Sequence, residues 1–378
     1  MSSIRYMAAV NSSIFVIMFG LGVCFTYLPD KMTKLSGSAA MSGFLASAFG
    51  LAYILSQYPL GKIADRFGFR PVIIAGFLLC GVSGMVYYSA DSVQWLIIGR
   101  VIQGVGEAPL WSLSPVLLAL LYPENKAQVM GWYTASFHFG LTAGPLAGTY
   151  IADVFGAQST FLGFSAASVT GGFIILALAA PKYRTDRKIE AKAGMMSIIR
   201  LLNKSVLAGI VMYGASYGLI VSVIPAFVLS VKNMDHGLAN IAFSLSFFTL
   251  GIIQIVSGRI VKIQNLRQAL TTGVLSMGAG LLVIIHNSGI LLFAGLLLLT
   301  SGLGIFSIAS MLYLQVKADS SHAGASSGVY FMFWGIGYFT VPFITGVFGS
   351  AELISSILLL QAVMLFAAAA LLVKTMKS

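Results

Sequence analysis

The chain has 378 residues, of which 58% are hydrophobic and only 9% charged, with a mean hydropathy of +0.93 and a net charge of +11. Soluble domains carry about 25% charged residues, so this composition excludes an ordinary soluble protein and indicates one that crosses a membrane repeatedly.

Twelve stretches are apolar and long enough to cross a bilayer, which takes about 20 residues of helix. In chain order they are 6–28, 38–60, 72–89, 94–121, 128–150, 159–180, 205–230, 237–257, 269–286, 290–314, 324–347 and 351–373. Little sequence remains for a soluble domain. We therefore predict an all-α membrane protein with twelve transmembrane helices.

The longest polar stretch, 181–200, separates six spans from six. It is too short for a domain, so we predict an N-terminal six-helix bundle (1–180), a basic cytoplasmic linker (181–204) and a C-terminal six-helix bundle (205–378). The tail of the linker, near 195–202, is amphipathic and is predicted to lie on the membrane surface. We expect the linker charges to contact anionic lipid.

The basic residues are distributed unevenly between the two sides of the membrane. With both termini on the inner side, 18 of the 22 lysine and arginine residues fall there. The outer loops hold only Lys31, Lys34 and Lys232, and Arg100 lies within a span. This positive-inside pattern explains the net charge by orientation. We expect cytoplasmic termini, a cell membrane (a bacterial inner membrane, from the short loops) and no nucleic-acid partner.

The first span follows a single basic residue, Arg5, and no small-residue cleavage site, which predicts a retained helix instead of a signal peptide. Cys24 and Cys80 lie inside predicted spans and form neither a disulfide framework nor a metal-binding spacing. The sequence contains no Walker loop, HExxH or CxxC motif, and no Ser/His/Asp set outside the spans. We expect no enzymatic activity, no cofactor and no metal.

The segment between the second and third spans, Gly61 to Arg70, reads GKIADRFGFR. Gly61 and Gly68 permit a tight reversal of the chain. Asp65 can accept hydrogen bonds at the positive N-terminus of a neighbouring helix, and Arg66 and Arg70 can pair with acids or with C-terminal helix carbonyls. We predict that this network closes the cytoplasmic side in one state and breaks in another. The alternative is that its charges only anchor the orientation.

The second half of the chain repeats the first. Residues 61–76 align without gaps on 258–273, at an offset of 197. The same offset pairs Gly131 with Gly328, Gly140 with Gly337 and Pro145 with Pro342. Parallel repeats of this kind place a substrate site between two six-helix halves. Asp65 is matched by Lys262, so we expect the gating chemistry in one half only.

The fourth span carries two charges in its apolar interior, Arg100 and Glu107. Each charge costs about 2.5–3.5 kcal/mol at a helix centre, and charges retained at that cost usually mark a functional site. Gln103, Trp111 and Ser114 share their helix face. We expect this polar and aromatic face to line a central, water-accessible cavity.

The fifth span contains Gly140, Gly144 and Gly148 at intervals of four residues. This spacing forms a smooth face that another helix can approach closely. Pro145 removes one backbone donor and is expected to bend the helix.

Three of these segments resemble signatures of the major facilitator superfamily of transporters. They are the loop from Gly61 to Arg70, the stretch from Leu96 to Ala108, and the segment from Gly140 to Gly148, which is similar to the helix-5 signature of the antiporter branch. Phe69 stands where the family usually has a basic residue, and Thr149 where the last glycine usually falls. The Arg100 to Ala108 string is similar to spinster-type transporters, and neighbouring sequence to drug:proton and vesicular-amine antiporters.

The resemblance covers essentially the whole chain and implies two pseudo-symmetric bundles that alternate access to a midplane site. It further implies a cavity lined by helices 1, 4, 7 and 10, a contact between Asp65 and helix 11, and a coupling role for Arg100. The glycine face of helix 5 is implied to pack across the boundary between the halves.

We interpret Glu107 as the protonation site, coupled to Arg100 and Gln103. Burial disfavours the charged form of a carboxyl group, and a nearby cation favours it. If substrate or a movement of Arg100 changed this balance, Glu107 would bind or release a proton. Arg100 and Glu107 lie seven residues apart, about 10.5 Å along the helix axis, so pairing would need a bridge. The alternative is a structural glutamate satisfied by hydroxyl groups.

His138, in the fifth span, could serve as a proton relay or could be a hydrogen-bonded core histidine. Tyr53, Tyr217 and Trp334, together with Trp111, could form aromatic walls for an apolar or cationic cargo, or could serve packing alone.

We expect a monomeric secondary transporter that exports a small organic molecule, cationic or amphipathic, by proton antiport. Two alternatives remain open: uptake by proton symport or facilitated diffusion, and a non-transporting membrane receptor.

Overall fold

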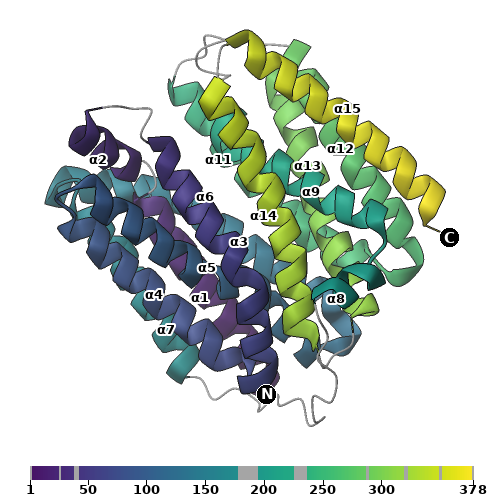
Figure 1. Cartoon of the computed structure of the whole chain (residues 1–378), viewed down its shortest axis with the longest axis horizontal. Helices are drawn as coiled ribbons and strands as arrows, with labels where there is room; N and C mark the ends of the chain where they lie inside the picture. Colours follow the sequence, from purple (N-terminus) through teal and green to yellow (C-terminus); the bar gives the residue numbers. More distant parts are fainter. Residues whose placement is uncertain are drawn as a thin grey trace.

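The computed structural model describes residues 2–24, 27–37, 42–177, 195–224, 236–286, 289–318, 322–348 and 351–376, and every regular element in these ranges is a helix. Eight of the helices are long and apolar enough to cross a membrane by length and composition. Figure 1 shows the purple-to-teal first half beside the green-to-yellow second half, with α14 along the boundary.

Each of the first six predicted spans is a helix. They are α1 (Ser2–Cys24), α3 (Ser42–Phe67), α4 (Phe69–Ser89), α5 (Val93–Leu121), α6 (Lys126–Phe155) and α7 (Ser159–Ala177). A turn of 3-10 helix, η2 (Pro123–Asn125), precedes α6. The helix α3 extends beyond the predicted span, so Asp65 and Arg66 lie on its last turns and only Gly68 forms the reversal, with a φ of +97°. The predicted turn role of Gly61 is therefore wrong, because it lies within the helix.

The second half follows the same plan. Its helices are α9 (Lys204–Gly218), continued by the π-helical η3 (Leu219–Val223), then α11 (His236–Ile260), η4 (Ile263–Asn265), α12 (Leu266–His286), α13 (Ile290–Lys317), α14 (Ala323–Phe348) and α15 (Ala351–Thr375). The predicted span 205–230 is described only to residue 224, and the rest lies outside the described residues.

Each half has its own apolar core. One cluster gathers buried side chains almost entirely from residues 6–175, and the other almost entirely from residues 202–372. The predicted linker is described only from residue 195, where the segment predicted to lie on the membrane surface forms the short helix α8 (Met195–Leu201). Ile198 of α8 is buried against Ala325 and Val329 of α14, so this face of α8 contacts protein.

Contacts that repeat at the offset of 197 confirm the internal repeat. Arg70, at the start of α4, donates to the Leu176 carbonyl at the end of α7 over 2.7 Å. Its counterpart Arg267 donates to the Val373 carbonyl at the end of α15 over 2.8 Å. Both arginines bind the negative C-terminus of the last helix of their own half, where a cation is favoured.

The two halves meet along two equivalent helix pairs, α3 with α14 and α6 with α11. Glycines let these backbones approach closely. A Cβ added at Gly324 would lie 2.6 Å from the Gly61 carbonyl oxygen, and one added at Gly258 would lie 2.7 Å from the Ala127 carbonyl oxygen. These pairs are related by the same offset, so the interface between the halves is itself pseudo-symmetric.

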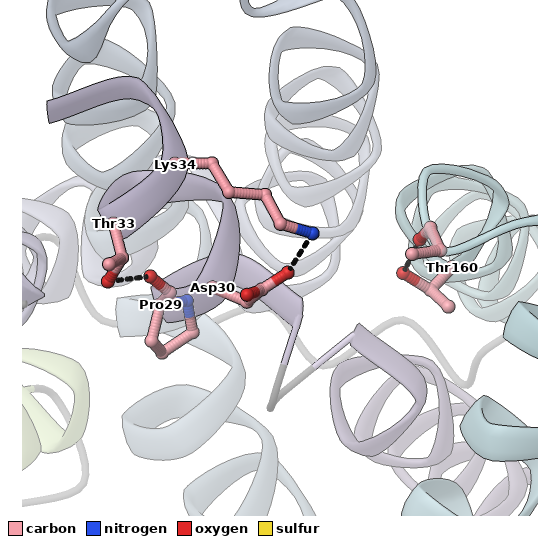
Figure 2. Close-up of polar contacts among 6 residues, drawn as sticks. Pro29, Asp30, Thr33, Lys34 and Thr160 are labelled. Atoms are coloured by element: carbon pink, nitrogen blue, oxygen red, sulfur yellow. Dashed lines mark hydrogen bonds and ion pairs between the residues drawn. The ribbon is translucent and has the colours of Figure 1, made fainter. Parts of the chain in front are cut away.

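The short helix α2 (Tyr27–Ser36) was not among the predicted elements, because it is too short and polar to span a membrane. It buries Leu28 and Met32, and Lys31 donates to the Tyr87 carbonyl at the end of α4 over 2.7 Å. Figure 2 shows the exposed Asp30–Lys34 ion pair of 2.7 Å along α2. An exposed pair of this kind adds little stability.

Candidate functional site

A continuous row of polar side chains runs along α5. Arg100 Nη1 donates to Gln103 Oε1 over 3.1 Å, and Gln103 Nε2 donates to Glu107 Oε1 over 2.7 Å. Gln103 is thus the bridge that the spacing of Arg100 and Glu107 requires. Tyr87 of α4 completes the row, since its hydroxyl donates to Gln103 Oε1 over 2.5 Å. We call these four residues the α5 row.

The α5 row lies deep in the protein. Gln103 and Glu107 are each 1% exposed, and neither lines the central cavity. The prediction that the whole helix face opens to the cavity is therefore wrong for these two residues, because packing against neighbouring helices buries them. Trp111, one turn beyond Glu107, does line the cavity. Its indole lies within interaction range of the Glu107 carboxylate, although Nε1 makes no hydrogen bond of standard geometry with the described residues.

A small cavity, with about 40 Å³ of space for water-sized molecules, lies between the two halves. Among the described residues, its walls are mainly aromatic and include no Asp, Glu, Lys or Arg side chain. The lining comprises Trp111, Tyr133, Thr134, Phe137 and His138 from the first half, and Tyr213, Tyr217, Gln254, Met311, Tyr330, Phe331 and Trp334 from the second. Four predicted cavity residues are therefore present: Trp111, His138, Tyr217 and Trp334.

The fifth predicted cavity residue, Tyr53, lies behind the wall. Its ring contacts the rings of Trp111 and Trp334, with centroids 5.7 and 6.0 Å away. The two indoles contact each other at 5.2 Å. We call these three residues the aromatic triad. It joins α3, α5 and α14, and thus both halves, at one edge of the cavity.

His138 joins the halves on the opposite side of the cavity. Nδ1 lies 2.7 Å from the Thr134 carbonyl and 2.9 Å from Gln254 Oε1, both acceptors, so this nitrogen carries the proton. Nε2 lies 3.0 Å from the Tyr217 hydroxyl and accepts from it. The amide of Gln254 then donates to Ser307 over 3.3 Å. His138 is thus hydrogen-bonded, as the second of the two interpretations predicted, and its side chain also lines the cavity.

Asp65 bridges the halves at the end of the molecule where α3 meets α14. It is 7% exposed, and its two carboxylate oxygens accept from the backbone amides of Gly324 and Ala325 over 2.7 and 2.8 Å. These amides belong to the first turn of α14, whose partial positive charge favours an anion. The implied contact of Asp65 with the eleventh span is therefore present. We call Asp65, Gly324 and Ala325 the Asp65 latch.

The two arginines of the same motif differ in their surroundings. Arg70 donates to the Ile175 carbonyl over 3.1 Å as well as to Leu176, which matches the predicted contact with C-terminal carbonyls. Arg66 is exposed and lies 5.1 Å from the Phe67 ring.

The glycine face of α6 packs within the first half. A Cβ added at Gly144 would lie 2.7 Å from Gly22 Cα on α1, and one at Gly148 would lie 3.0 Å from Val23 Cα. Gly140 likewise packs against Phe15 and Met18 of α1. The expectation that this face crosses the boundary between the halves is wrong, because another face of α6, with Gly131, meets α11. Pro145 lies inside α6, which continues to Phe155.

Several residues of this site escaped the sequence reasoning, above all Gln254. The internal repeat could have located it, because the offset of 197 pairs Gln254 with Gln57 on the equivalent helices α11 and α3. Nothing in the sequence marked Tyr87 as a functional residue, since it is one aromatic residue near the end of a predicted span. The described residues contain no cluster of three metal-ligating side chains, and Cys24 and Cys80 are buried free thiols.

Known proteins resemble this chain in sequence and in fold. Residues 10–342 match the Major Facilitator Superfamily. Multidrug resistance protein 2 of Bacillus subtilis is 29% identical over 43% of this chain and 42% of its own length. Quinolone resistance protein NorA of Staphylococcus aureus is 28% identical over 38% of this chain and 37% of its own. The chain thus spans less than half the length of these two relatives.

Among solved structures, the human organic anion transporter MFSD10 superposes with a TM-score of 0.81 at 14% identity, covering 98% of this chain and 100% of that one. The proton:xylose symporter XylE superposes with a TM-score of 0.82 at 13% identity, covering 98% and 96%. At these identities the likeness shows the fold alone, two six-helix halves. With the family match over most of its length, the chain belongs to the major facilitator superfamily.

Proposed function

We propose that this transporter exports a small organic molecule, cationic or amphipathic, in exchange for protons. The observation that carries the proposal is the α5 row: a buried carboxylate joined to a guanidinium by one amide, a single helical turn from a cavity between the halves. A carboxylate in such surroundings is a candidate functional group, because structure alone gains little from it.

Glu107 is the proposed proton carrier. As a carboxylate it accepts from Gln103 and balances the charge of Arg100. Protonation of Glu107 removes its negative charge and turns one carboxyl oxygen into a donor. The hydrogen bonds of the α5 row must then rearrange. Trp111 is the neighbour that transmits this change to the cavity. The wall nearest Glu107 would then differ between the protonated and ionised states, which is what coupling requires.

The Asp65 latch is the proposed gate. In this conformation it joins the two halves, together with the close backbone contact of Gly61 and Gly324, and we propose that these contacts close one end of the cavity. Alternating access requires that these contacts separate in the other state. The residue aligned with Asp65 in the second half is Lys262, and a cation cannot accept hydrogen bonds from a helix N-terminus, so the proposed gate has one charged side only.

The cargo class follows from the cavity walls and from relatives. A cavity lined mainly by aromatic rings suits flat apolar bodies and cations. The names of the relatives, multidrug resistance and quinolone resistance proteins, also favour export of organic compounds. Uptake by proton symport remains the second candidate, because XylE, a proton:xylose symporter, shares the fold.

The distribution of basic residues supports an orientation with both termini in the cytoplasm. The proposed location is a cell membrane, specifically a bacterial inner membrane. The proposed units are bundles 1–180 and 205–378 joined by the basic linker 181–204, in a monomer surrounded by lipid. Protons and the small molecule are its proposed partners.

Proteoliposomes that contain trapped pyranine test this function. When ethidium, a planar aromatic cation, is added outside, antiport makes the lumen more alkaline as protons leave. Symport would acidify the lumen, and facilitated diffusion or a non-transporting receptor would leave it unchanged, so each of these outcomes contradicts antiport.

Glu107→Gln should abolish the pyranine signal and keep ethidium binding, since the amide retains the size of the side chain without the titratable proton. The matched control is Glu124→Gln, which removes an exposed acid outside the row and should leave the signal unchanged. A full proton signal in Glu107→Gln would remove Glu107 from the coupling role.

A further inference from the structure

The short helix α2 is fastened to the end of α4 through Lys31. Its Nζ donates to the carbonyl oxygens of Tyr87 and Tyr88 over 2.7 and 3.2 Å, and it lies 5.4 Å from the centre of the Phe161 ring. These carbonyls belong to the last turn of α4, where a helix has unpaired acceptors and a partial negative charge. The cation therefore fixes the backbone at Tyr87.

The side chain of Tyr87 occupies a slot between α5 and α7. A Cβ added at Gly99 of α5 would lie 2.5 Å from Tyr87 Cε1, so the ring needs the space that this glycine leaves. The Phe161 ring of α7 contacts the tyrosine ring, with centroids 6.0 Å apart. Tyr87 is fully buried, and the slot directs its hydroxyl to Gln103 Oε1. Backbone and ring are both held, so the hydroxyl has little freedom to move.

This hydroxyl holds the amide that joins Arg100 to Glu107. A guanidinium can only donate, so the amide atom that Arg100 approaches is Gln103 Oε1, and the other atom, Nε2, faces Glu107. Oε1 accepts two hydrogen bonds, of which the one from Tyr87 is the shorter, 2.5 Å against 3.1 Å. A donor aimed at a carboxylate favours its ionised form. The position of this amide therefore influences how readily Glu107 takes up a proton.

We propose that Tyr87 is a positioning residue for proton binding by Glu107, and that Lys31 acts through Tyr87. Neither side chain bonds Glu107. Tyr87 holds Gln103 so that Nε2 stays directed at the carboxylate, and Lys31 holds Tyr87. This inference rests on the proposed role of Glu107 as proton carrier, and it names two residues that set the pH at which the carrier is loaded.

The other titratable groups around Glu107 leave this effect measurable. Arg100 is the charged side chain that favours the ionised form of Glu107. The remaining groups within electrostatic reach are thiols and phenols, which are neutral below about pH 8. They are Cys24 of α1, Tyr53 of α3, Cys80 and Tyr87 of α4, Tyr217 of α9 and Tyr338 of α14. Near neutral pH, proton uptake by Glu107 therefore depends on Arg100 and on the hydrogen bonds of the α5 row.

Infrared spectroscopy of the purified protein measures this protonation without transport. The C=O band of a protonated carboxyl group that disappears in Glu107→Gln belongs to Glu107, and its intensity against pH gives a midpoint. Tyr87→Phe should raise the midpoint by about 0.5–1 pH unit, the effect of weakening one hydrogen bond. Lys31→Met should raise it by a smaller amount. Lys31→Arg, which can still donate to the carbonyls at the end of α4, should restore the midpoint of the parent.

A double substitution separates positioning from direct electrostatics. If Lys31 acts through the Tyr87 hydroxyl, Lys31→Met should cause no further shift in the Tyr87→Phe protein, whereas the loss of a distant cation would add its own shift. The matched control is Lys34→Met. It removes a cation from the same helix whose partner is the exposed Asp30 (Figure 2), and it should leave the midpoint unchanged.

An unchanged midpoint in Tyr87→Phe, additive shifts in the double variant, or equal shifts in Lys31→Met and Lys34→Met would each overturn the proposal. If Tyr87→Phe does not fold, the comparison of Lys31→Met with Lys34→Met decides it. A Glu107 band that is absent at every pH refutes the proposed carrier and this inference with it. The pyranine assay reports separately: proton exchange with an unshifted midpoint in Tyr87→Phe refutes only this inference, whereas the expected shifts without proton exchange refute only the antiport.

Discussion

Asp65→Asn should open the latched end of the transporter. The substitution keeps one acceptor oxygen but replaces the other with an NH₂ group, which faces the Gly324 or Ala325 amide as a second donor. A hydrogen bond to a charged group contributes about 1.5–3 kcal/mol, and an anion at a partly buried helix N-terminus up to about 2 kcal/mol. Because these contributions overlap, we expect a loss of about 2–4 kcal/mol, or roughly 30- to 700-fold in the ratio of closed to open states.

Thiol labelling in detergent measures this ratio. Ser327 lies between the latch and the cavity, is 1% exposed, and donates to the Ser112 carbonyl across the boundary between the halves. In a Cys24→Ser, Cys80→Ser background, the rate at which a maleimide modifies Ser327→Cys reports how often this end opens. Asp65→Asn should raise the rate by one to three orders of magnitude.

Glu124→Gln, an exposed acid in the turn before α6, is the charge-matched control and should leave the labelling rate unchanged. If Asp65→Asn also labels within threefold of its parent, the Asp65 latch does not hold the closed state, and the gating role fails.

Three further sites are tested by thermal melting in detergent. Gly144→Val should lower stability by about 1–3 kcal/mol, because its Cβ would lie 2.7 Å from Gly22 Cα on α1; a melting temperature equal to that of the parent would contradict this contact. Arg70→Lys should destabilise more than Arg267→Lys, since Arg70 binds two carbonyls and Arg267 has one such bond; the reverse order would refute the reasoning. His138→Ala should cost about 1–3 kcal/mol, because it leaves the buried Tyr217 hydroxyl and Gln254 amide without their partner; His138→Asn, which can donate to Gln254, should recover part of the loss.

Much of the fold could be predicted from residue order. Runs of about 20 apolar residues specify membrane helices because lipid offers the backbone no other hydrogen-bond partners. The offset of 197 predicted the repeat, and it recurs in the bonds of Arg70 and Arg267. Asp65 could be predicted to bind a helix N-terminus because a carboxylate beside a turn has few other favourable partners.

Partners that depend on packing could not be predicted in this way. A glycine face specifies close approach but not which helix approaches, and in the folded chain Gly144 meets α1 instead of the other half. Gln103, Glu107 and Trp111 were predicted to share one cavity-facing side of a helix, yet Gln103 and Glu107 are buried away from the cavity and only Trp111 lines it.

The sequence by itself determined the helices, their pairing into two related halves and the charged pair inside the fourth span, because each depends on local apolar length or on residue order. Only the tertiary structure decided that Gln103 bridges this pair, that His138 meets Gln254, and that Gln57 has no such partner among the described residues. Residues in two related helices can be alike while their surroundings differ, since the neighbours that satisfy a buried polar atom come from elements distant in the chain.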